Sequence, residues 1–231
     1  MRPTVLLFDI DGTLITTGGV GRRALEEALE RAHGKQSAPY LTFPLDGMTD
    51  RAIVRGALRA IGHEPTPPEV DALLATYIQV LEENVARADA REYRLHEGMV
   101  RAVDESMERG CAVGLGTGNI REGARVKLAR VGIYDRFAFG GFGCDHEDRM
   151  ELIRRGAQRG AEQLGMPLTE CRVVVIGDTP KDVAAAKGIG AECVGVGTGA
   201  FSAEQLIAVG ADCAFPDLTA PGALEALLDR S

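Results

Sequence analysis

Short apolar runs, separated by amphipathic stretches, recur along most of this chain. The run Val5–Phe8 is bounded by polar and turn-forming residues, as is typical of a strand buried in a parallel sheet. Further runs of this kind are Ala112–Leu115, Phe137–Phe139, Val173–Ile176 and Cys193–Val196, with a weaker one at Cys213–Phe215. Because helical patterns separate most of these runs, the sequence predicts an α/β fold with a parallel sheet and right-handed crossovers.

The segment between the first two predicted strands has a different pattern. From about Val20 to Ala90 it contains no convincing strand but three helical patterns: Arg22–His33, Asp50–Ile61 and one opened by a capping box of Thr66 and Glu69. We therefore expect an all-helical insert, with linkers near Thr16–Gly19 and Arg91–Glu97. The predicted domains are a core of residues 1–16 and 96–231 and a cap of residues 17–95.

Composition narrows the class of protein. With 45% hydrophobic and 26% charged residues, the 231-residue chain is expected to fold without disulfides. A net charge of −8 disfavours nucleic acid and anionic membranes as partners. The five cysteines have no metal-type spacing, and neither a signal peptide nor a membrane span is evident, so we expect a cytoplasmic protein. The oligomeric state stays open.

Polar clusters rich in glycine follow three of the predicted strands: Asp9–Thr13, Gly116–Asn119 and Gly177–Asp182. In parallel sheets, ligands bind beyond the carboxyl ends of the strands, so these clusters are expected to meet. Four carboxylates would then lie together, namely those of Asp9, Asp11, Asp178 and Asp182. Such a group repels itself unless a cation bridges it, and oxygen ligands suit Mg²⁺. A magnesium ion opposite Thr and backbone N–H donors suits a phosphoryl group.

Each cluster also has a simpler interpretation. Asp9 could be only a turn residue, and Thr179 with Asp182 could only begin a helix. Asn119 and Glu122 could form a capping box. Chance could account for any one of these clusters. It is a much weaker explanation for three clusters that all lie at strand ends in this order.

The clusters resemble the motifs of a known family. Asp9–Leu14 resembles the first motif of the haloacid dehalogenase superfamily, Thr117–Asn119 the second, and Gly177–Asp182 the fourth. The insert is similar to the small cap of the branch that contains phosphoglycolate phosphatase and β-phosphoglucomutase. The resemblance implies a Rossmann-like parallel-sheet core with an inserted all-helical cap domain.

The resemblance also implies roles. Asp9 would attack phosphorus and form an aspartyl-phosphate, and Asp11 would be the general acid/base, which requires a raised pKa. Thr117 would donate to a phosphate oxygen, and Gly118, Asn119 and the cap residue Thr49 would contact substrate. The Mg²⁺ ligands would be Asp9, the carbonyl of Asp11, and Asp178, while Asp182 would orient waters or a cationic side chain.

The third motif departs from the family pattern. The family has a Lys, or sometimes an Arg, before the helix that leads into the fourth strand, and this chain has no Lys there. We predict that Arg149 takes this role, with Lys127 and Lys181 as competitors. The alternative is a surface ion pair of Arg149 with Glu147, Asp148 or Glu151.

The predicted function is that of a Mg²⁺-dependent phosphatase acting on a small phosphorylated metabolite. A phosphomutase of the β-phosphoglucomutase type shares the aspartate pair and stays an alternative. A receiver-like signalling domain also phosphorylates an Asp beside Mg²⁺, but it would be shorter and lack the insert. The identity of the substrate stays open.

Overall fold

A six-stranded sheet forms the centre of the molecule. The computed structural model describes residues 2–34, 41 and 43–228. The strand order is β5-β4-β1-β6-β7-β8, and each pair of neighbours is parallel. The strands are β1 (Thr4–Phe8), β4 (Ala112–Gly116), β5 (Gly140–Gly141), β6 (Arg172–Gly177), β7 (Glu192–Val196) and β8 (Cys213–Phe215). The predicted α/β fold with a Rossmann-like sheet is confirmed.

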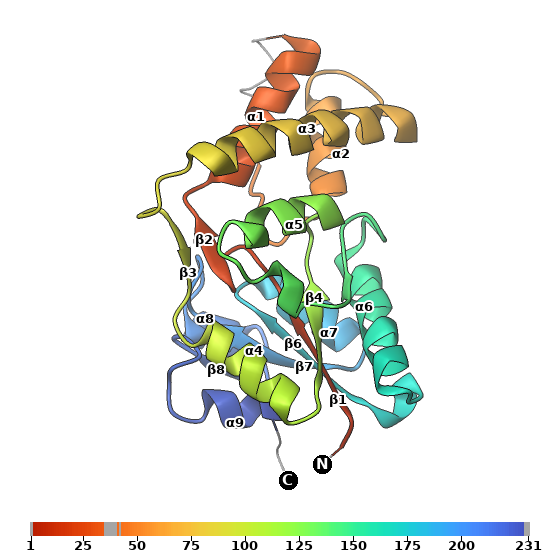
Figure 1. Cartoon of the computed structure of the whole chain (residues 1–231). Coiled ribbons are helices and arrows are strands. Elements are labelled where there is room, and N and C mark those ends of the chain that lie inside the picture. Colours follow the sequence, from red (N-terminus) through yellow and green to blue (C-terminus); the bar gives the residue numbers. More distant parts are fainter. Residues whose placement is uncertain (1, 35–40, 42, 229–231) are drawn as a thin grey trace.

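Helices cover both faces of this sheet (Figure 1). Successive strand residues point to opposite faces, so Leu6 and Phe8 belong to one hydrophobic cluster and Val5 and Leu7 to another. The first cluster includes residues of α4 (Met99–Glu108), α5 (Arg121–Ala129) and α9 (Ala223–Leu228). The second includes residues of α6 (Arg149–Leu164), α7 (Pro180–Gly188) and α8 (Ala203–Ala208). Short 3₁₀ turns lie at Tyr134–Arg136 and Leu168–Glu170.

One predicted strand is misplaced. Phe137–Phe139 is not a strand, and the sheet pairing in this region falls on Gly140–Gly141 instead. Phe137 and Phe139 are buried, but in different clusters, which explains why the run looks like a strand. The edge strand needs glycine because a Cβ at Gly141 would lie 1.8 Å from the carbonyl oxygen of Leu152 in α6.

The insert contains α1 (Val20–His33), α2 (Asp50–Ala60) and α3 (Pro67–Arg87), which lie together beyond one end of the sheet (Figure 1). Helix α3 packs against α1 and α2 within the insert and against α5 of the core. The start of α3 follows the predicted capping box, since Glu69 accepts from Thr66 N. At the start of α2, the side chain of Thr49 accepts from Ala52 N.

The two connections between core and insert pair with each other. Strand β2 (Ile15–Thr17) and strand β3 (Tyr93–Leu95) form a separate antiparallel ribbon. The sequence predicted linkers in these places and missed the pairing. We propose that the boundary between core and cap lies in this ribbon, close to the predicted positions 17 and 95.

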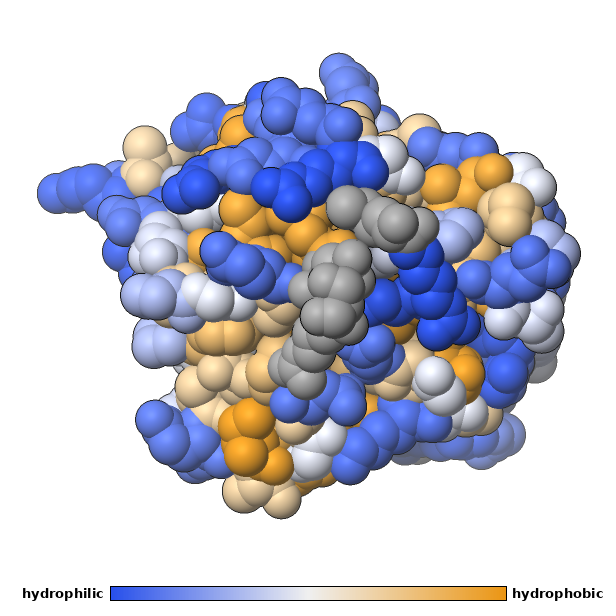
Figure 2. Space-filling view, turned by 90° about the horizontal axis from the view of Figure 1, so that it is seen from below, coloured by the Kyte–Doolittle hydropathy of each residue, from blue (hydrophilic) through white to orange (hydrophobic). Residues whose placement is uncertain are grey.

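The surface opposite the insert carries hydrophilic side chains interspersed with smaller apolar areas (Figure 2). Within the described residues, no helix has the length and apolar character needed to cross a membrane.

Candidate active site

A cavity of about 280 Å³ lies where the carboxyl ends of the central strands meet the insert. Its lining includes residues of all three polar clusters and of the loop before α2, residues 45–50. The clusters meet because β1 lies between β4 and β6, so the three strands end side by side.

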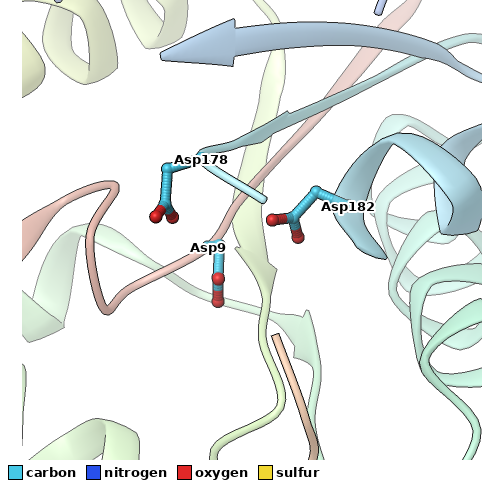
Figure 3. Close-up of side chains that lie close together, drawn as sticks. All are labelled: Asp9, Asp178 and Asp182. Atoms are coloured by element: carbon cyan, nitrogen blue, oxygen red, sulfur yellow. The ribbon is translucent and has the colours of Figure 1, made fainter. Parts of the chain in front are cut away.

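Three buried carboxylates gather next to the cavity, and two of them, Asp9 and Asp178, line it. Asp9 follows β1, Asp178 follows β6 and Asp182 lies in the first turn of α7, and their side chains point into the same space (Figure 3). One oxygen of each lies within 4.8 Å of the others, and all three residues are buried.

Arg149, at the start of α6, supplies a positive charge to this cluster. Its Nη2 lies 2.8 Å from Asp9 Oδ2, and its Nε and Nη2 both donate to Asp182 Oδ1, at 3.0 and 2.5 Å. The alternative of a surface ion pair is wrong, because Arg149 is buried and its partners are these two aspartates.

Both carboxylate oxygens of Asp182 accept hydrogen bonds. Oδ1 accepts from Arg149, and Oδ2 accepts from the backbone N–H and the hydroxyl of Thr179, at 3.1 and 2.7 Å. The interpretation as a helix start therefore also holds, since Thr179 and Asp182 form a capping box for α7. Asp182 is better placed to orient Arg149 than to bind a metal directly.

A hydrogen bond from Thr13 orients one of the two carboxylate oxygens of Asp178. Its Oδ1 accepts from the hydroxyl of Thr13 over 2.8 Å. A Cβ at Gly199 would lie 1.8 Å from its Oδ2, and one at Gly12 would lie 2.3 Å from it. The two glycines therefore keep the space beside Asp178 Oδ2 clear of side chains.

The charges of this cluster do not balance. Burial raises the pKa of Asp9 to about 6, against the lowering effect of Arg149. Burial, followed by the charges of Asp182 and Asp9, raises the pKa of Asp178 well above its usual value. If all three carboxylates were ionised opposite one guanidinium, two negative charges would have no counter-ion within this cluster. An oxygen donor set with this imbalance fits a divalent cation such as Mg²⁺.

Asp11 also lines the cavity, and it belongs to a polar group that the sequence did not predict. The ammonium of Lys127 donates to Asp11 Oδ2 and to Asn119 Oδ1, over 2.6 and 2.7 Å. Asn119 Nδ2 donates to the same Asp11 Oδ2 and to Thr117 Oγ1, each over 2.9 Å. The proposed capping box of Asn119 and Glu122 does not form, since the N-cap of α5 is Ile120.

Lys127 changes the expected electrostatics of Asp11. Burial by itself raises the pKa of the Asp11 carboxyl group, but the charge of Lys127 and hydrogen bonds from Lys127, Asn119 and Thr17 bring it below its usual value. The sequence-based expectation of a raised pKa is therefore wrong for this arrangement. The long side chain of Lys127 reaches back from α5 to the strand ends, where it contacts Asp11 and Asn119. One feature of the sequence could have indicated this contact, because Lys127 is a single Lys on the otherwise apolar, buried face of α5.

The loop before α2 contacts the core around the cavity. The backbone N–H of Asp50 donates to Gly118 O over 2.8 Å, and the hydroxyl of Thr49 donates to Glu147 O over 3.0 Å. Arg149 Nη1 also donates to Gly47 O. Thr49, predicted to contact substrate, thus joins cap to core in this structure.

Lys181 is the remaining competitor for the third-motif cation. It is exposed and donates to Asp46 O over 2.8 Å, at the edge of the same loop. Among the three candidates, Arg149 is the one in contact with Asp9.

Comparison with known proteins agrees with this geometry. Residues 3–190 match the sequence profile of the haloacid dehalogenase-like hydrolases. The chain belongs to this family.

The individual proteins that resemble this chain are distant from it in sequence. A phosphoglycolate phosphatase of Rhodobacter capsulatus is 29% identical over 138 residues, which span 57% of this chain and 58% of that protein. A hydrolase from Pseudomonas syringae has a similar fold, with a TM-score of 0.71, 21% identity, and coverage of 98% of this chain and 100% of that one. CbbY from Rhodobacter sphaeroides, solved with phosphate, has a TM-score of 0.72 and 20% identity, with coverage of 98% and 99%.

Proposed function

We propose that this haloacid dehalogenase-like hydrolase is a Mg²⁺-dependent phosphatase that hydrolyses a small phosphomonoester. The observation that carries the proposal is the buried cluster of Asp9, Asp178 and Asp182, which Arg149 neutralises only in part. A nucleophilic carboxylate can approach an anionic phosphoryl group only where positive charge surrounds both.

In the proposed reaction, Asp9 attacks phosphorus and becomes an aspartyl-phosphate. Arg149, 2.8 Å from Asp9, orients the nucleophile and offers its planar fork to the phosphoryl oxygens. The hydroxyl of Thr117, which hydrogen-bonds Asp9, can donate to the same oxygens. Asp9, the carbonyl of Asp11, and Asp178 would hold Mg²⁺, which supplies the charge that the protein lacks.

Asp11 is proposed as the acid/base, with the negative charge of a bound phosphoryl group offsetting the lowering of its pKa by Lys127. It would give a proton to the leaving oxygen and later take one from the water that hydrolyses the aspartyl-phosphate. Its side chain is 41% exposed and lines the cavity, so substrate and water can both reach it. We also propose that the cap excludes water during the reaction, which the contacts of residues 47–50 with the core support.

The size of the cavity supports a small substrate, and the named relative makes phosphoglycolate the first candidate. CbbY, which shares the fold, has been solved with xylulose-(1,5)bisphosphate, so sugar phosphates belong in the same screen. A cytoplasmic location is proposed because Cys111, Cys171 and Cys193 are buried free thiols.

The test is phosphate release from p-nitrophenyl phosphate and phosphoglycolate, with Mg²⁺ or with excess chelator. The wild type should need Mg²⁺, and Asp9→Asn should be inactive. Asp135→Asn, a carboxylate removed from an exposed turn, is the matched control and should be fully active. Full activity in chelator, or a wild-type rate for Asp9→Asn, would exclude the mechanism. Isomerisation of a sugar phosphate without release of phosphate would favour the phosphomutase.

A further inference from the structure

Lys127 is a buried cation that the reaction outlined above leaves without a role. Its side chain is 5% exposed, and its backbone carbonyl accepts a hydrogen bond from the hydroxyl of Tyr93 over 2.6 Å. A buried ammonium is costly unless it is paired, so its position requires the partners that it has. Those partners are Asp11 and Asn119.

Lys127 and Arg149 contact different aspartates. Arg149 bridges Asp9 and Asp182, whereas Lys127 contacts Asp11. Lys127 is therefore no substitute for Arg149 on the nucleophile, and its ammonium contacts Asp11 and Asn119 instead.

The contacts of Lys127 distinguish the two oxygens of Asp11. Oδ2 accepts from Lys127 Nζ at 2.6 Å and from Asn119 Nδ2 at 2.9 Å. Lys127 also binds Asn119 Oδ1, so the three side chains form a closed triangle in which each orients the other two. Two donors on one oxygen leave no room for a proton there, because an O–H would oppose the N–H groups. The Thr17 hydroxyl, which also reaches Asp11, does not impose this limit, because a hydroxyl can accept as well as donate.

We propose that Lys127, with Asn119, is a positioning residue that fixes Asp11 Oδ2 so that Oδ1 exchanges the proton with substrate and water. The proposal rests on the proposed phosphatase function. In the first step, Asp9 bonds to phosphorus, the ester P–O bond breaks, and the leaving oxygen takes the proton from Oδ1. In the second step, water bonds to phosphorus, Oδ1 takes its proton, and the bond from phosphorus to Asp9 breaks.

This role makes the effect of Lys127 depend on the leaving group. An alkoxide leaves only with a proton, so an alkyl phosphate needs a well-oriented acid. A nitrophenolate is stable enough to leave without one. A residue that orients the acid should therefore matter much more for the alkyl ester, whereas a residue that only supports the fold should affect both esters alike.

The experiment compares kcat and KM for p-nitrophenyl phosphate and glycerol 2-phosphate at saturating Mg²⁺. Lys127→Met should lose about 100-fold more kcat on the alkyl ester than on the aryl ester, at the lower end of the range for acid catalysis. Lys127→Arg, which keeps the charge, should recover part of the loss. Lys187→Met makes the same change on the exposed side of α7 and should leave both rates unchanged.

Asp11→Asn separates this inference from the function on which it rests. If Asp11→Asn shows the selective loss on the alkyl ester and Lys127→Met does not, the role of Lys127 is wrong and the function stands. If Asp11→Asn shows no selective loss, the proposed acid/base itself fails. Equal losses on both esters in Lys127→Met, or a change in KM alone, would also overturn the proposal. Should that variant not fold, Lys127→Gln, which keeps an N–H donor without the charge, gives the same comparison.

Discussion

The carboxylate of Asp50 in the cap accepts a hydrogen bond from the backbone N–H of Ile120 in the core, over 2.8 Å. The N–H groups at the start of a helix lack partners within the helix, and here a residue of the insert supplies one for α5. Burial raises the pKa of Asp50 to about 6, against the lowering effects of Lys127 and of this hydrogen bond. Contact between cap and core therefore depends on a carboxyl group that is costly to ionise.

Asp50→Asn should remove one pH-dependent part of the stability. The pKa of Asp50 is about 6 in the folded protein and 3.8 in the reference state, so the folded state holds its proton more tightly. The free energy of unfolding of the wild type should therefore fall, relative to Asp50→Asn, as the pH rises from 4 to 7. The shift of about two pKa units corresponds to about 3 kcal/mol.

Urea unfolding of both proteins across this range measures that difference, in which the contributions of the other titrating groups cancel. Asp71→Asn is the control, because Asp71 lies on the surface of α3 and pairs there with Arg51. The stability difference from the wild type should change more across this pH range for Asp50→Asn than for this control. A constant difference for Asp50→Asn would contradict the prediction.

Gly118→Ala should hinder closure of the cap. A Cβ at Gly118 would lie 2.2 Å from the backbone oxygen of Met48, so the loop before α2 would have to withdraw from the core. We expect kcat/KM for the physiological substrate to fall at least tenfold, which steady-state kinetics will show. Gly123→Ala, in α5, is the matched control, since its Cβ would lie 3.6 Å from Asp50 Oδ2, an ordinary van der Waals distance. That control should keep its activity and gain up to about 1 kcal/mol of stability.

Arg149→Ala should lower kcat by roughly 10²–10³-fold, the usual loss when a donor to developing charge is removed. Arg149→Lys should recover only part of the lost kcat, because an ammonium cannot contact Asp9 and Asp182 as the guanidinium fork does. Lys181→Ala, which removes a contact with Asp46 O, should stay within a few fold of the wild type. Nearly full activity of Arg149→Ala at saturating Mg²⁺ would show that the cation has another source. Thermal melts of each variant separate lost catalysis from lost folding.

Mg²⁺ should raise the melting temperature, because its binding relieves repulsion among the buried carboxylates. At 100 times its Kd the gain is about 2.7 kcal/mol, or roughly 5–10 °C for a chain of this size. Asp178→Asn should lose this response, yet in chelator it should be at least as stable as the wild type, since burial and like charges disfavour the carboxylate. Asp135→Asn should respond as the wild type does. An undiminished response of Asp178→Asn would place the ion elsewhere.

The convergence of Asp9, Thr117 and Asp178 follows from sequence because it depends on topology. Each follows an apolar run, and parallel strands present their carboxyl ends at one edge of the sheet. The start of α3 was equally predictable, because its capping box of Thr66 and Glu69 is a local interaction. Phe137–Phe139 was misassigned because an apolar run shows that residues are buried, not that their backbone joins a ladder.

The sequence did not allow us to predict the partners of Lys127 or the pairing of β2 with β3. The reach of Lys127 depends on where α5 lies relative to Asp11, which no local pattern records. The ribbon joins segments about 75 residues apart, and three-residue strands carry too little periodicity to be recognised. Both features are set by long-range packing.

The ribbon has a consequence for how this fold can change over generations. Thr17 and Tyr93 face each other across it, so the chain leaves the core and re-enters it at adjacent positions. The insert between these two residues is therefore equivalent to one long hairpin loop that leaves and rejoins the core at one place. The entropic cost of closing such a loop rises only with the logarithm of its length. The intervening helices can therefore be lengthened, shortened or exchanged for others without moving a strand of the sheet. After gene duplication, copies of one hydrolytic core can thus acquire new substrate specificities by exchanging the helical insert, while the reacting residues stay in place.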